Sequence, residues 1–127
     1  MSTDGRKLAL VVDDVLVNRQ LAAAFFSRLG WEVGETGGGR MALEWLERHP
    51  TVRLVLLDIG MPDLDGEAVC RQIRDTPALA KLAVVAYTAH ALPVDVERFL
   101  ASGFDAVLIK PVSLQMLREV IDRLFPG

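Results

Sequence analysis

The stretch Leu8-Ala9-Leu10-Val11-Val12 is continuously apolar, ends in two β-branched residues and runs directly into Asp13 and Asp14. A short apolar run without alternation predicts a strand that is buried on both faces, which is typical of parallel sheets. The same pattern recurs in three further runs, Leu54–Leu57, Leu82–Tyr87 and Ala106–Ile109, and more weakly in Trp31–Val33. The sequence therefore predicts five short strands, four of them strongly.

Segments with helical periodicity separate these runs. In the first segment Val17, Leu21, Ala24, Phe25 and Leu29 recur at helical spacing, and we expect this stripe to be the buried face. Strands that alternate with helices predict a doubly wound α/β fold with three layers, α/β/α. The middle layer is a five-stranded parallel sheet, and right-handed crossovers place helices on both of its faces. The other helical segments are centred on Met41–Leu46 and on Gly66–Asp75, Val94–Ser102 and Leu114–Leu124.

Length and composition limit the classes of protein. The chain has 127 residues, 51% of them apolar and 24% charged, which predicts one folded domain over residues 1–127 with a core at about 7–125. The formal charge of −3 argues against binding nucleic acid. A single cysteine, Cys70, excludes an internal disulfide. No apolar run is long enough to cross a membrane and the first residues do not resemble a signal peptide, so we expect a soluble, cytoplasmic protein that does not bind membranes.

Charged or hydroxyl side chains follow each strongly predicted strand. Asp13 and Asp14 follow the first of these runs, Asp58 the second, Thr88 the third and Lys110 the fourth. Because ligands of open parallel sheets bind at the carboxyl ends of the strands, we expect these side chains to converge on one edge of the sheet.

This set of residues favours phosphoryl chemistry. Three neighbouring carboxylates repel one another unless a cation neutralises them, and oxygen ligands with one lysine opposite suit Mg²⁺. A metal, Lys110 and the Thr88 hydroxyl would together hold phosphoryl oxygens, which is the main requirement of phosphoryl transfer. A carboxylate can itself be the nucleophile and form an acyl phosphate. Asp58 would lie between the acidic pair and the Thr88–Lys110 side, so it is the candidate acceptor.

Four separated motifs resemble the response-regulator receiver domain. They are Val12-Asp13-Asp14, the run Leu-Leu-Asp-Ile-Gly-Met-Pro-Asp-Leu-Asp-Gly at 56–66, Ala86-Tyr-Thr-Ala89, and Lys110-Pro111. The resemblance implies a flavodoxin-like sheet of order 2-1-3-4-5. It also implies that Asp14 and Asp58 ligate Mg²⁺ directly, that Asp13 acts largely through water, and that Gly60 offers its backbone carbonyl. The peptide bond between Lys110 and Pro111 would be cis.

The same resemblance implies a role in two-component signalling and points to the hybrid-kinase or phosphorelay type. Asp58 would accept a phosphoryl group from a phosphohistidine on a sensor histidine kinase or a histidine phosphotransfer protein. Lys110, the Thr88 hydroxyl and the Ala89 amide would bind the phosphoryl oxygens. The domain would catalyse its own phosphorylation and dephosphorylation without being a conventional enzyme, as a monomer or as a weak, phosphorylation-dependent dimer.

Phosphorylation would switch the face formed by the segments 94–102, 106–109 and 114–124 and so control a separate output protein. Two positions depart from the family pattern. Val107 stands where receivers commonly carry Tyr or Phe, and Gly60 has no side chain to shield the phosphoryl group, which leaves His90 to limit the access of water. The candidates for partner contact on the switching face are Asp95, Arg98, Arg118, Glu119 and Asp122.

Three other functions are compatible with parts of the pattern. A receiver-like module could act by binding alone, without phosphorylation. A metal-dependent phosphatase with an aspartyl nucleophile would need an acid-x-acid motif, whereas Asp13 and Asp14 are adjacent. A flavin or nucleotide carrier would need a loop after the first strand that accepts phosphate, and this acidic loop would repel one.

Overall fold

A computed structural model describes residues 7–126 and contains one five-stranded parallel sheet of order β2-β1-β3-β4-β5. This order confirms the predicted doubly wound, flavodoxin-like topology. The weakly predicted strand, Trp31–Val33, differs from the observed one. The strand β2 begins at Glu32, which pairs with Leu8 of β1, and ends at Thr36, which pairs with Val12. Trp31 instead packs into the core. The strands are β1 Leu8–Val12, β2 Glu32–Thr36, β3 Val52–Asp58, β4 Ala83–Thr88 and β5 Ala106–Ile109.

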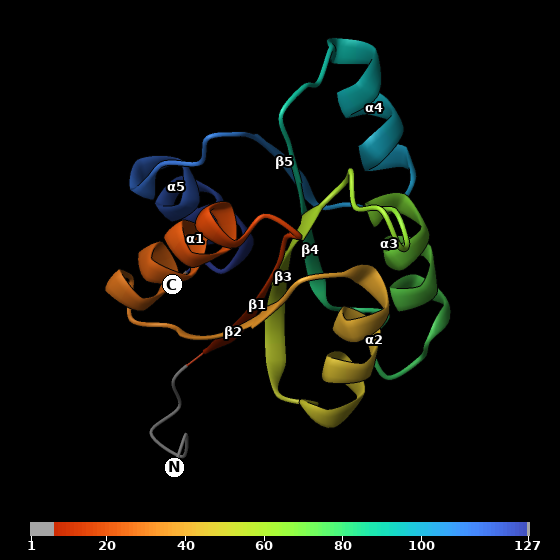
Figure 1. Ribbon diagram of the computed structural model, residues 1–127, viewed down its shortest axis with the longest axis horizontal. Helices are drawn as coiled ribbons and strands as arrows, with labels where there is room; N and C mark the ends of the chain where they lie inside the picture. The colour runs from red at the N-terminus through yellow and green to blue at the C-terminus, as the bar shows by residue number, and fades with distance from the viewer. Residues whose placement is uncertain (1–6, 127) are drawn as a thin grey trace.

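Helices cover both faces of the sheet (Figure 1). The helices α1 and α5 pack on one face, and α2, α3 and α4 pack on the other. Each face of the sheet carries one buried apolar cluster beneath its helices. No helix in residues 7–126 has both the length and the apolar character needed to span a membrane. The helices are α1 Leu16–Arg28, α2 Gly39–Arg48, α3 Gly66–Asp75, α4 Pro93–Ala101 and α5 Leu114–Leu124.

The buried face of α1 was predicted only in part: Phe25 and Leu29 pack against the core, but Val17, Leu21 and Ala24 are exposed. Ala22, Ala23 and Phe26 are the buried residues, whereas the side chain of Val17 is 71% exposed and that of Leu21 is 44% exposed. The helix is apolar on nearly all sides, so its periodicity does not specify which side packs on the sheet. The consequence is an apolar stripe on the outer surface of α1.

The ends of the helices follow local sequence signals. Gly30 and Gly103 come just after α1 and α4 and adopt φ values of 88° and 113°, the left-handed conformation that glycine tolerates best. The Asp65 carboxylate accepts a hydrogen bond from the Ala68 amide at 2.8 Å and so caps α3. The peptide bond between Lys110 and Pro111 is cis, as the resemblance implied.

Candidate functional site

The strand register brings the predicted site residues to one level of the sheet. Val12 pairs with Leu57, so Asp13 lies beside Asp58, and Asp58 in turn pairs with Tyr87. Thr88 pairs with Ile109, which places Lys110 one residue further along the same edge. Backbone hydrogen bonds continue past the strands, with the Lys110 amide donating to the Thr88 carbonyl at 2.7 Å. The parallel sheet itself therefore collects these side chains.

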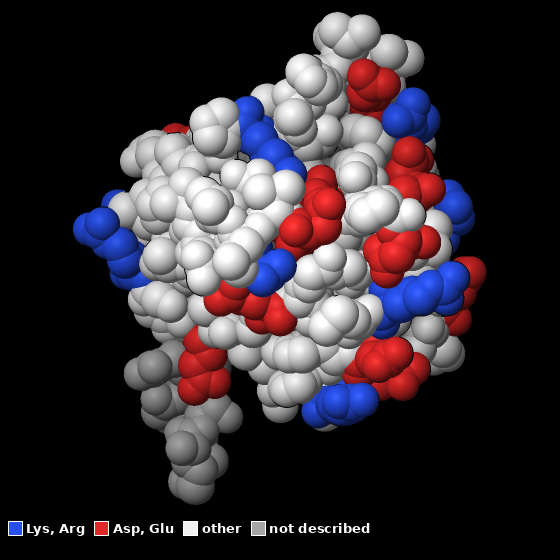
Figure 2. Space-filling model, viewed as in Figure 1, with Lys and Arg blue, Asp and Glu red and all other residues white. Residues whose placement is uncertain are grey.

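Three carboxylates and one lysine form the centre of this edge. Asp13, Asp14 and Asp58 each offer a carboxylate oxygen, and these three atoms lie within 4.8 Å of one another. The Lys110 Nζ atom lies 3.2 Å from Asp13 Oδ2 and 3.4 Å from Asp58 Oδ1. Figure 2 shows acidic side chains gathered near the middle of the face viewed, where the ends of β1 and β3 lie in Figure 1. One lysine thus opposes three acidic groups.

Burial changes the acidity of two groups at the site. It raises the pKa of Asp58 above the ordinary value of 3.8, although the Gly60 amide, which donates to Asp58 Oδ1 at 3.1 Å, and the Lys110 ammonium act in the opposite direction. Burial, together with the negative charges of Asp13 and Asp58, raises the pKa of Tyr87 to about 12. The Tyr87 phenol therefore stays protonated beside the carboxylates.

The donor set fits a hard divalent cation. Asp13 is fully buried and its Oδ2 atom accepts no hydrogen bond within residues 7–126, so the ion pair with Lys110 is its polar contact there. The carboxylate of Asp14 is exposed and open to solvent. Carboxylate oxygens on one open edge, with an excess of negative charge, match the ligands and partial hydration that Mg²⁺ prefers.

Thr88, Ala89 and Gly60 border this cluster. The Thr88 hydroxyl donates to the His90 carbonyl at 3.0 Å and accepts from the His90 amide at 3.3 Å. Ala89 and Gly60 are exposed, and a Cβ atom built on Gly60 would meet nothing within 4 Å. The space beside Gly60, two residues after the buried Asp58, is therefore not filled by other atoms.

Sequence reasoning missed two features of the site. Arg19, in α1, donates from Nη1 to the Asp13 carbonyl at 2.9 Å and pairs through Nε with Glu35 at 3.2 Å, so it ties the β1–α1 loop to β2. The exposed apolar residues of α1 begin at its first residue, Leu16, and Val15 just before the helix is also exposed, so both lie on the surface close to Asp14 in the chain. No local signal distinguishes these residues, because both roles depend on which way α1 faces.

The predicted switching face is formed by α4, β5 and α5. Arg118, Glu119 and Asp122 are exposed there. Asp95 is half-buried and accepts from the Leu92 amide at 2.9 Å at the start of α4, and Arg98 pairs with Glu67 of α3 at 3.4 Å. Val107 is half-buried and packs against the α2–α3–α4 cluster. Asp95 and Arg98 are thus already bound within the domain.

Comparisons with known proteins agree on one family. Residues 9–122 match the model of the response regulator receiver domain. The chain is 36% identical over 120 residues to the gliding motility regulatory protein of Myxococcus xanthus and 34% identical over 128 residues to the signal transduction histidine-protein kinase BarA of Escherichia coli. These matches cover 94% and 98% of this chain but only 15% and 14% of the two relatives.

A solved structure gives the same result. The chain superposes with a TM-score of 0.83 and 25% identity on a co-crystal structure of the Saccharomyces cerevisiae histidine phosphotransfer signaling protein Ypd1 and the receiver domain of its downstream response regulator Ssk1. The alignment covers 92% of this chain and 87% of that chain.

Proposed function

The chain belongs to the response regulator receiver domain family, and from this premise we propose that Asp58 is the phosphoacceptor of a two-component relay. The observation that carries the proposal is the position of the Asp58 carboxylate. It is buried at the carboxyl end of β3, within reach of the Lys110 ammonium and beside two further carboxylates. We propose that residues 7–125 make up one receiver domain.

In the proposed reaction an Asp58 carboxylate oxygen attacks the phosphorus atom of a phosphohistidine. The new O–P bond forms as the P–N bond breaks, and the imidazole leaves with the electron pair of that bond and takes up a proton. Lys110 would hold one phosphoryl oxygen, and the Thr88 hydroxyl and Ala89 amide would hold others. Asp13, Asp14, Asp58 and the Gly60 carbonyl would hold Mg²⁺, which when bound supplies positive charge to the phosphoryl oxygens.

The Thr88 hydroxyl supports a switch between two arrangements. In this structure it is hydrogen-bonded to the backbone of His90. To bind a phosphoryl oxygen it must exchange these partners, which would move the β4–α4 loop and bias the α4–β5–α5 face toward a second arrangement. We propose that this face controls a separate output protein, with Arg118, Glu119 and Asp122 as its exposed charged residues.

Removal of the metal provides the first test. Acetyl phosphate with Mg²⁺ is expected to add one phosphoryl group to the protein, and EDTA is expected to reduce this adduct to background, because three carboxylates would then repel the incoming phosphoryl oxygens. Intact mass spectrometry measures both. An adduct of equal size in EDTA would contradict the proposed role of Mg²⁺.

The apolar stripe on α1 provides a test of the partner. The Ssk1 receiver domain was solved in complex with a phosphotransfer protein, and we propose that a donor of this class docks on Val15, Leu16 and Val17 beside Asp14. Val17→Asp is expected to slow transfer from a phosphorylated histidine phosphotransfer domain about tenfold, because a charge would be buried in an apolar contact. Phosphorylation by acetyl phosphate is expected to stay unchanged.

Leu100→Asp on α4 is the matched control for this variant, since Leu100 is also apolar and 47% exposed but lies on the other face of the sheet. Equal slowing by both variants, or a loss of phosphorylation by acetyl phosphate in Val17→Asp, would contradict docking on α1.

His90 provides a test of hydrolysis. Because Gly60 has no side chain and nothing fills the space beside it, we propose that His90, exposed on the β4–α4 loop, limits the access of water to the acyl phosphate. His90→Ala is then expected to speed dephosphorylation severalfold, measured as decay of the phosphorylated mass after the donor is removed. An unchanged decay rate would show that His90 does not shield the group.

A further inference from the structure

An open pocket of about 500 Å³ lies at the end of the sheet opposite Asp58. The first residues of β3 and β4, the segments before them and the last turn of α5 form its walls. Its volume lies within the range of about 300–1,000 Å³ that is typical of small-molecule sites. Most of the residues that line it are of apolar type, among them Pro50, Val52, Pro77, Leu79, Leu82 and Phe125, and polar atoms make up the rest of its surface.

The aromatic wall of this pocket is anchored in the core. The Phe125 ring meets the Trp31 ring edge to face, with centroids 5.4 Å apart and an angle of 68° between the planes. Trp31 is only 6% exposed and packs in the same way against the buried Phe26. The Phe125 ring is therefore held in place before any ligand arrives, which lowers the entropic cost of binding.

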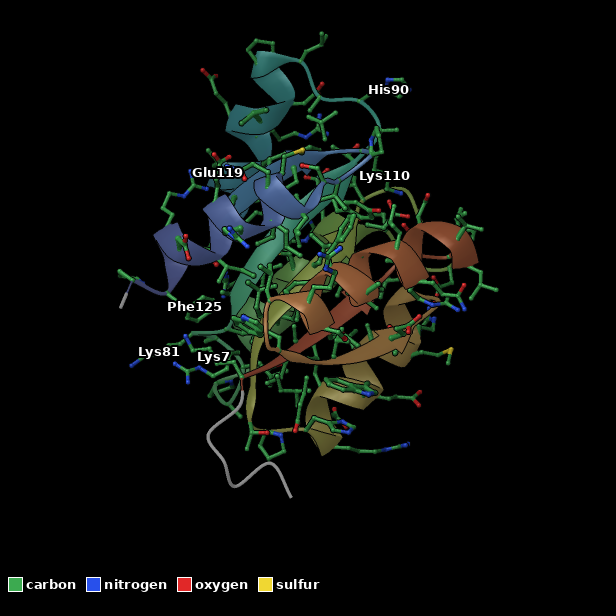
Figure 3. All side chains as sticks on the ribbon, turned by 90° about the vertical axis from the view of Figure 1, so that its left-hand side faces the viewer. Lys7, Lys81, His90, Lys110, Glu119 and Phe125 are labelled. Atoms are coloured by element: carbon green, nitrogen blue, oxygen red, sulfur yellow. The ribbon has the colours of Figure 1, made fainter. Side chains whose placement is uncertain are left out.

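Three cations surround this apolar surface. Arg53 and Lys81 line the pocket, and neither forms an ion pair with any carboxylate in residues 7–126. The Arg53 guanidinium carbon lies 5.7 Å and the Lys7 Nζ atom 5.3 Å from the centroid of the Phe125 ring. Figure 3 shows Lys7 and Lys81 close to Phe125, far from Lys110 and His90.

The acidic residue in the described lining is already bound. Asp105 Oδ2 accepts from the Val84 amide at 2.9 Å and from Arg74 Nη2 at 3.0 Å. Arg74 also donates to the backbone carbonyls of Ala80, Gly103 and Leu82, and Leu82 lines the pocket. Asp105 therefore contributes no free negative charge, and the pocket is cationic although the whole chain carries −3.

We infer that this pocket binds a small carboxylate with a compact apolar body. The body, a ring or a branched chain, lies against Phe125 and the proline and leucine side chains. The carboxylate lies at the rim between Arg53 and Lys81. This site is separate from the phosphorylation site and needs neither Asp58 nor a metal ion.

Three probes with the same apolar body but different charge test the inference. They are 4-phenylbutyrate, its neutral amide 4-phenylbutanamide and the cation 4-phenylbutylamine, each titrated into the ¹⁵N-labelled domain and followed by amide chemical shifts. The carboxylate is expected to give saturable shifts around Arg53, Lys81 and Phe125, the amide to bind at least threefold more weakly and the amine not to bind. Equal affinity for the three probes, or no saturable shift at these residues with the carboxylate, would overturn the inference.

Variants separate the charge from the cavity. Arg53→Gln and Lys81→Gln are each expected to weaken binding of 4-phenylbutyrate about threefold, as befits exposed charge pairs. Arg40→Gln, at an exposed position at the start of α2, makes the same charge change and is expected to have no effect. Ala78→Trp, at an exposed lining position, is expected to fill the pocket and abolish binding. Unchanged binding in Ala78→Trp would place the probe elsewhere.

Discussion

Asp58→Asn is expected to abolish the phosphoryl adduct completely while the domain stays folded. Asparagine has the same shape as aspartate, so the hydrogen bond from the Gly60 amide to Oδ1 can be kept, but the amide oxygen is too weak a nucleophile to form an acyl phosphate. Intact mass after incubation with acetyl phosphate and Mg²⁺ measures the result. An adduct that survives in this variant would show that another residue accepts the group.

The same variant is expected to be more stable than the wild type when no metal is bound. Burial raises the pKa of Asp58 above 3.8, so the folded state binds this proton more tightly than the unfolded chain does. The wild type therefore loses stability relative to Asp58→Asn as the pH rises above 3.8. Thermal unfolding in EDTA across this range measures the difference. Asp75→Asn, which makes the same chemical change at an exposed position at the end of α3, is the control.

Lys110→Met is expected to produce the second large effect, a loss of about 3 kcal/mol in the free energy of unfolding in EDTA at pH 7, because one partner of a buried ion pair is removed. Lys110 is only 16% exposed, and the fully buried Asp13 Oδ2 would lose its polar contact. The loss is expected to shrink at low pH, where Asp58 becomes protonated, and to be partly reversed by Mg²⁺, which would neutralise the same carboxylates. Denaturant unfolding with Mg²⁺ or with EDTA measures both effects.

The rate of phosphorylation by acetyl phosphate is expected to fall about 10²-fold in Lys110→Met, in line with the loss of one charged donor that faces the transition state. Lys110→Arg keeps the charge and is expected to recover most of the stability. Lys81→Met removes an exposed lysine without an ion pair in residues 7–126 and is the control for stability. A loss of stability in Lys110→Met that Mg²⁺ does not reduce would contradict a shared role of lysine and metal.

The sheet and the residues at its edge were predictable because the signal for each is local. Continuous apolar runs marked β1, β3, β4 and β5, and parallel strands bring their carboxyl ends together whatever the details of packing. Asp13, Asp58 and Lys110 were therefore brought together by the order of the strands alone. The range predicted for the edge strand β2 was too short and began one residue too early. Only Thr36 of this strand is buried, so its sequence carries little hydrophobic signal.

Features that depend on orientation were not predictable. The buried face of α1 was predicted only in part because Leu, Val, Ala and Phe occur all round that helix. Packing on the sheet selects Ala22, Ala23 and Phe26 as its fully buried residues. That choice also leaves Val15, Leu16 and Val17 on the surface beside the site and turns Arg19 toward the Asp13 carbonyl. Likewise, the bond between the Thr88 hydroxyl and the His90 carbonyl depends on the path of a loop.

Local signals in the sequence predicted four of the strands and the chemistry at their carboxyl ends, because each of these depends on a short run of residues. The order 2-1-3-4-5 was predicted from the resemblance to receiver domains, and the sheet confirms it. What lies at the other end of the sheet depends on tertiary packing. Arg53, Lys81 and Phe125 come from three segments that are far apart in the chain, and no periodicity relates them. They form one cationic pocket because the first residues of β3 and β4 lie beside the last turn of α5. The packing of Phe125 on Trp31 fixes the end of α5 to the core.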